Sequence, residues 1–205
     1  MILAALLLVT QVAVQDPRLD RLDPDTRSAV AAVVDSARVA RLPIEPIIQR
    51  ALEGATKGAP STRIVAAVRK LAVDLGTART ALGTSAAEAE LEAAVAALRA
   101  GATPEVIAHL RDTRRPPLTM ALSVLADLVA SGVPADSAAA AVLALAPKAR
   151  DADLVEFRRA VERDIALGAP PGAATSVRLN AGALDVSSGN TTTGNPNTPT
   201  RRSRP

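Results

Sequence analysis

The chain has 205 residues, a formal charge of +3, no cysteine, tyrosine or tryptophan, and only one phenylalanine and one histidine. This composition excludes disulfide bonds, catalytic thiols and cysteine-based zinc sites, and it leaves no aromatic platform on which a nucleobase could stack. The last five residues contain Arg201, Arg202 and Arg204, so the rest of the chain lacks a concentrated basic surface and we expect no binding of nucleic acid.

The N-terminus is an uninterrupted apolar run from Ile2 to Val9, and the first charged residue is Asp16. A helix needs ~20 apolar residues to span a bilayer, so this run is too short. It is typical of a signal peptide over residues 1–15, cleaved after Ala13 or Gln15, although no Lys or Arg precedes it. The prediction is an exported protein, periplasmic or extracellular and bacterial, with no stable transmembrane helix after cleavage. The alternative is a hydrophobic N-terminal helix that packs on the domain.

Glycine and proline residues recur between apolar segments and predict an all-α chain from about residue 24 to 179. Glycine favours the position after the last turn of a helix, and proline favours the first turn. Turns such as Gly58-Ala-Pro60 and Gly132-Val-Pro134 precede segments whose apolar residues recur every three or four positions. The predicted helices cover residues 24–40, 43–57, 60–82, 86–100, 104–113, 117–131, 134–147, 151–167 and 171–179.

The spacing of these glycine–proline turns indicates a tandem duplication. A shift of 74 residues places Pro43 on Pro117 and Gly58-Ala-Pro60 on Gly132-Val-Pro134. Later turns align at a shift of 67, so the second copy is shorter by seven residues near Gly83. We predict a helical domain over 16–180, with a leading helix at 24–40, copy one at 43–113 and copy two at 117–179. Such units would form a stacked bundle or a short α-solenoid. The alternative is that alanine-rich helices align by chance.

The core of this domain is expected to consist of alanine, leucine, isoleucine and valine, because large aromatic residues are almost absent. Phe157 lies near Leu154 and Val161 on the predicted 151–167 helix, and it is expected to be the one large buried side chain. From residue 181 to 205 the chain is rich in Asn, Gly, Ser, Thr and Pro. We predict that this tail is disordered, because it has too little apolar surface to offset the entropy of ordering.

No arrangement of residues suggests catalysis, a metal or a cofactor. His109 lies on a predicted short helix with no Gly-x-Ser-x-Gly or Ser-x-x-Lys motif in the chain to supply a nucleophile. Acidic residues two positions apart diverge around a helix and cannot chelate one ion together. Helix capping is the better interpretation, with a capping box at Ser85-Ala-Ala-Glu88 and a polar cap at Asp151. The acidic residues concerned are Glu88, Glu90 and Glu92, and Asp151 and Asp153.

These observations favour a non-catalytic helical scaffold that binds an unknown protein or peptide partner. Arg111, Arg114 and Arg115 lie between the two copies and are the candidate partner contacts, with a solvated linker as the alternative interpretation. A carrier of lipid or a small apolar ligand is the alternative function. A third hypothesis is attachment to an envelope surface through the basic C-terminal arginines.

Overall fold

A computed structural model describes residues 16–188 of the chain, and their side chains as far as residue 181. In this part the protein is all-helical and has no strand. The predicted signal peptide and residues 189–205 of the predicted tail lie outside the described residues. The elements are the short 3₁₀ helix η1 (Pro17–Arg21) and the helices α1 (Pro24–Val39), α2 (Glu45–Thr56), α3 (Ser61–Leu82), α4 (Glu88–Ala100), α5 (Pro104–Thr113), α6 (Thr119–Ala130), α7 (Ala135–Leu145), α8 (Asp151–Ala166) and α9 (Pro171–Ser188).

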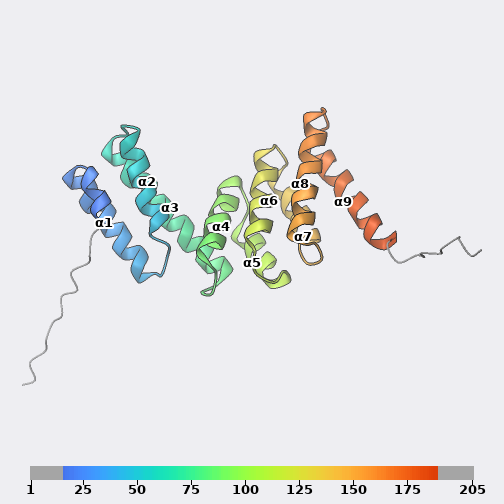
Figure 1. The fold of residues 1–205 in the computed structure, drawn as a ribbon, viewed down its shortest axis with the longest axis horizontal. Helices are drawn as coiled ribbons and strands as arrows, with labels where there is room; N and C mark the ends of the chain where they lie inside the picture. Colours follow the sequence, from blue (N-terminus) through green and yellow to red (C-terminus); the bar gives the residue numbers. More distant parts are fainter. Residues whose placement is uncertain (1–15, 189–205) are drawn as a thin grey trace, which may run out of the picture.

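The helices follow one another along an elongated molecule, with the two ends of the described chain far apart (Figure 1). In one row, α4 packs against α6 and α6 against α8. In a second row, α1, α3, α5, α7 and α9 each pack against the next. Helix α2 lies on the same side as the first row (Figure 1) and packs against α3 of the second row, and the contacts of α6 with α7 and of α8 with α9 also join the two rows. The architecture is therefore two layers of helices with the core between them.

The buried side chains form one continuous core that extends from Leu19 near the first end to Ala174 on α9. Its members are almost entirely leucine, isoleucine, valine and alanine, as the composition predicted. Phe157 is only half-buried and packs against the core, so the prediction that it is the one large buried side chain is wrong. The buried core residues of α8 are Leu154 and Val161, which are 0 % exposed and lie two turns apart on one face of the helix.

The glycine–proline turns mark the helix boundaries as predicted. Gly101 closes α4 with a φ of 113°, in the left-handed region that glycine adopts without strain, and Pro104 opens α5. From α1 to α8, every boundary lies within two residues of its predicted position. The last helix differs, because α9 continues to Ser188 rather than ending at residue 179. No proline follows Pro171 until Pro196, and an internal glycine such as Gly182 weakens a helix by only about 1 kcal/mol.

The predicted caps are corrected by the structure. Ser85 lies in the loop before α4, and the cap is made by Glu90, whose Oε2 accepts a hydrogen bond of 2.9 Å from the Ala87 backbone N–H. At α8, the carboxylate that accepts the Arg150 N–H, at 2.9 Å, belongs to Asp153 rather than Asp151. Acidic side chains therefore cap the N-termini of these helices, as their positions predicted, but each cap comes from the third residue of the helix.

Candidate functional site

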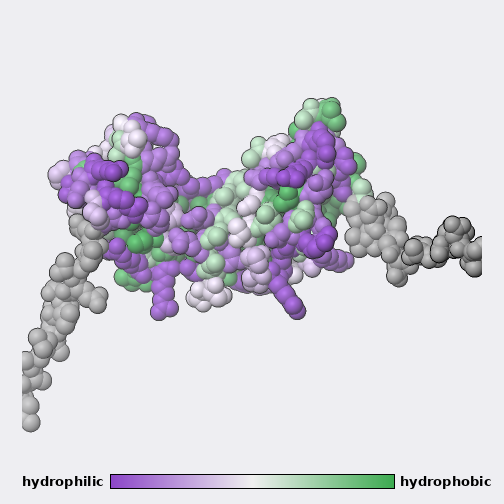
Figure 2. Space-filling view, viewed as in Figure 1, coloured by the Kyte–Doolittle hydropathy of each residue, from purple (hydrophilic) through white to green (hydrophobic). Residues whose placement is uncertain are grey.

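A groove of about 530 Å³ lies between α2 and α4, with α3 as its floor. Figure 2 shows the molecule hollowed between the lobe that carries α2 and the lobe that carries α8, with hydrophilic residues covering the α2 side. The groove is lined from three helices: Glu45, Pro46, Gln49, Arg50 and Glu53 from α2, Leu71 and Leu75 from α3, and Glu92, Val95, Ala96 and Arg99 from α4. We call this feature the α2–α4 groove.

The length of α3 explains why the row of helices is open at this point. α3 has 22 residues and α7 has 11, which correspond to about 33 Å and 16 Å at the helical rise of 1.5 Å per residue. Both α2 and α4 pack against the long α3. Further along, the short α7 lies between α6 and α8 in the chain, and α6 and α8 pack directly against each other. A groove therefore lies between α2 and α4, where two helices share a long partner.

The floor of the α2–α4 groove offers little apolar surface. Leu71 and Leu75 of the floor and Val95 at the foot of α4 line the groove but are 6 %, 0 % and 5 % exposed, because they belong to the core. The walls are polar. Glu45, Gln49 and Glu53 recur every four residues along α2, and Glu92 and Arg99 lie two turns apart on α4 with the small Ala96 between them. The groove can therefore offer both donors and acceptors of hydrogen bonds.

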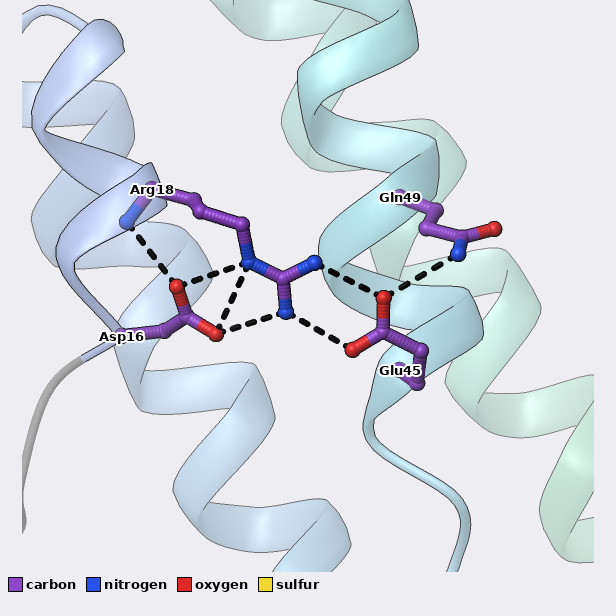
Figure 3. A network of polar contacts seen from close by, with 4 residues as sticks. All are labelled: Asp16, Arg18, Glu45 and Gln49. Carbon is purple, nitrogen blue, oxygen red and sulfur yellow. Dashed lines mark hydrogen bonds and ion pairs between the residues drawn. The ribbon is translucent and has the colours of Figure 1, made fainter.

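One end of the α2 wall is fixed by a network of charges (Figure 3). The Arg18 guanidinium donates to both carboxylate oxygens of Glu45, at 2.8 and 2.7 Å, and to both oxygens of Asp16. Gln49 Nε2 donates to Glu45 Oε1 at 3.0 Å. Arg18 holds the pKa of Asp16 at about 2 and lowers the pKa of Glu45, in each case mainly through these hydrogen bonds. The network ties η1, which the sequence did not predict, to the start of α2.

Other charges on the walls are also paired within the protein. Lys57 and Arg50 donate to Glu53, at 2.5 and 3.3 Å, and the hydrogen bond from Lys57 lowers the pKa of that carboxylate. Arg99 Nε donates to Asp74 Oδ2 at 3.0 Å. Glu92 differs, because among the described residues its exposed carboxylate has neither a hydrogen bond nor an ion pair.

The three arginines predicted to contact a partner do not line the α2–α4 groove. Arg114 is only 11 % exposed, and its guanidinium donates to the carbonyls of Ala146 and Ala149, at 2.6 and 2.7 Å, and to Asp151. Arg111 Nη1 donates to the Ala81 carbonyl, at 2.7 Å, at the end of α3. Only Arg115 of the three is exposed without such a contact among the described residues. Arg114 is therefore a structural link rather than a free surface charge.

Ionisable side chains elsewhere do not form a metal site within the part of the chain that the structure describes, where no three His, Asp or Glu residues cluster suitably. His109 is exposed on α5. The sequence did not predict the groove residues, although the seven-residue difference between the two predicted copies was a signal, because it falls where α3 is longer than α7. Comparison of the chain with family models, curated proteins and solved structures gave no match.

Proposed function

We propose that this chain is a non-catalytic scaffold of duplicated helical units that binds an extended segment of a partner protein in the α2–α4 groove. The observation that carries the proposal is the open groove with polar walls. An extended peptide does not pair its own backbone N–H and C=O groups, so it needs donors and acceptors from its binding site. Gln49, Glu92 and Arg99 line the groove with groups of both kinds.

The lining favours a peptide over the alternative ligand, a lipid or small apolar molecule. A site for such a ligand is predominantly apolar and surrounds most of the molecule. Here the leucines of the floor are already covered by the core, and the walls carry carboxylates and guanidiniums. An apolar ligand would gain little burial and would desolvate these charged groups without pairing them.

Two arginine links support the duplication. In copy one, Arg79 donates to the carbonyl of Arg41, just before α2, and to the carbonyls of Thr84 and Ala86 between α3 and α4. In copy two, Arg114 lies just before α6 and donates to carbonyls between α7 and α8. Each link joins the segment before the copy to the loop between its second and third helices. The connection is equivalent in the two copies although the arginine comes from different positions, and the arrangement agrees with a short α-solenoid.

Selection from a random twelve-residue peptide library displayed on phage tests the proposal. The variant Ala96→Trp places a large side chain at an exposed position on the groove wall, and Ala140→Trp makes the same change at an exposed position on α7. Peptides selected on the wild-type protein should bind Ala140→Trp normally and lose at least tenfold in affinity for Ala96→Trp. Circular dichroism checks that both variants fold. Equal binding to both variants would place the peptide outside the groove, and failure to select any peptide would overturn the proposal.

Export is part of the proposal and depends on residues 1–15, which lie outside the described residues. None of the helices within residues 16–188 is long and apolar enough to cross a membrane. The mass of the protein recovered from the periplasm or medium of a bacterial host tests the export step. A new N-terminus after Ala13 or Gln15 would support it, and a chain that stays in the cytoplasm with residues 1–15 intact would contradict it.

A further inference from the structure

We infer that the segment bound in the α2–α4 groove carries a lysine or arginine that pairs with Glu92. The inference rests on the proposed function and specifies the chemistry of the partner. It starts from the difference between Glu92 and the other charged residues of the groove, which are paired within the protein. Glu45 accepts from Arg18 and Gln49, and Glu53 accepts from Lys57 and Arg50.

The positive charges of the groove are committed in the same way. Arg99 donates to Asp74 at 3.0 Å, and Asp74 also accepts from Lys70 at 3.2 Å. Arg50 donates to Glu53 at 3.3 Å. An acidic residue of a partner would have to compete with these contacts, whereas a basic residue meets the Glu92 carboxylate, which has no partner among the described residues.

Binding makes this pairing necessary. A peptide lying against α4 removes water from the Glu92 carboxylate, and a charge that loses water without gaining a partner opposes binding. Glu92 is one helical turn from Ala96, whose methyl group leaves room along the wall. The aliphatic part of a lysine or arginine can lie over Ala96 while its charged end reaches Glu92. A small or uncharged residue at this position of the peptide would leave the carboxylate unpaired.

The selection is repeated on Glu92→Gln, which keeps the shape of the side chain and removes its charge. Glu88→Gln is the matched control, because Glu88 is also exposed and lies one turn earlier on α4 but does not line the groove. Peptides selected on the wild-type protein and on Glu88→Gln should share a basic residue at one position. That preference should disappear with Glu92→Gln.

The wild-type peptides should bind Glu92→Gln about fivefold more weakly, in line with an exposed ion pair of up to about 1 kcal/mol. Salt at 1 M should reduce the difference, because it screens exposed charges. Groove-binding peptides with no shared basic residue, or with the same preference on Glu92→Gln, would overturn the inference and leave the proposed function standing. Failure to select any peptide on the wild-type protein would overturn both.

Discussion

Glu90 is a buried carboxylate that joins the N-termini of two helices, and its removal should destabilise the fold. Its side chain is 6 % exposed. Oε2 accepts from the Ala87 N–H at 2.9 Å at the start of α4, and Oε1 accepts from the buried Leu118 N–H at 2.8 Å at the start of α6. Both contacts lie at helix N-termini, where the helix dipole favours negative charge. One side chain therefore caps α4 and fixes the helix that follows the linker.

The variant Glu90→Ala removes both acceptors. A buried donor left without an acceptor costs about 1–3 kcal/mol, and loss of a helix N-cap contact costs about 0.5–2 kcal/mol. Since the two contacts are on one residue and need not add fully, we expect a loss of about 2–4 kcal/mol in the free energy of unfolding. The variant Glu90→Gln keeps one carbonyl oxygen but turns an NH₂ group toward the other backbone donor. It should lose about 1–2 kcal/mol, between wild type and Glu90→Ala.

Urea unfolding followed by far-ultraviolet circular dichroism measures these differences, since the chain has no tryptophan or tyrosine to report by fluorescence. Glu92→Ala is the matched control, because Glu92 is exposed on the same helix and unpaired among the described residues. It should change stability by less than about 0.5 kcal/mol. Hydrogen exchange at the Leu118 amide should become faster in Glu90→Ala. If Glu90→Ala and Glu92→Ala unfold at the same urea concentration, the argument from buried hydrogen bonds is refuted.

Three further predictions concern stability. Phe157→Ala should cost about 1–3 kcal/mol by urea unfolding, less than the ~3–5 kcal/mol of a fully buried phenylalanine, because Phe157 is half-buried; a larger loss would place it in the core. Arg114→Ala should lower the free energy of unfolding by about 1–3 kcal/mol, because two loop carbonyls and Asp151 lose their hydrogen-bond donor. Arg115→Ala should have no measurable effect on stability. Equal losses in the two variants would contradict the structural role of Arg114. The thermal midpoint should fall as the pH drops from 4 towards 2, because the folded-state pKa values of Asp16 and Asp23 are about 2, below the usual 3.8. The stabilisation that these two carboxylates provide is present above pH 3.8 and is lost as the pH falls through the folded-state pKa. The double variant Asp16→Asn, Asp23→Asn should therefore show a shallower fall of the thermal midpoint with pH.

Helix positions could be predicted from the sequence because they depend on local chemistry. Gly101 and Pro104, for example, end one helix and start the next through backbone geometry that each residue imposes by itself. The short helix η1 carries local signals too, because the Asp16 side chain caps it and Pro17 is its first residue. Where η1 packs could not be predicted, because its contact with α2 joins Arg18 to Glu45, which is 27 residues away.

Residue roles that depend on long-range contacts could not be predicted from the sequence. The position of Arg114 in a linker favours a surface charge, but its hydrogen bonds reach carbonyls 32 and 35 residues away. The spacing favours a capping box at Ser85, whereas burial of Glu90 follows from the packing of α4 against α6. Spacing within one helix shows which residues can cap it, but only the packing of other helices shows which of them is buried.

The candidate groove follows from a difference in length rather than from a motif. A row of equal helical units would bring α2 against α4 as it brings α6 against α8, and the groove would close. The extra turns of α3 keep α2 and α4 apart on a long floor, and the network of Arg18, Asp16 and Glu45 holds α2 in place against η1. Most of the charged side chains on the two walls pair within the protein: Glu45 and Glu53 with partners that include Gln49 and Lys57, and Arg99 of α4 with Asp74 of α3. A groove can therefore arise in a row of packed helices when one intervening helix is longer than its counterpart, without any change in the residue types that build the core.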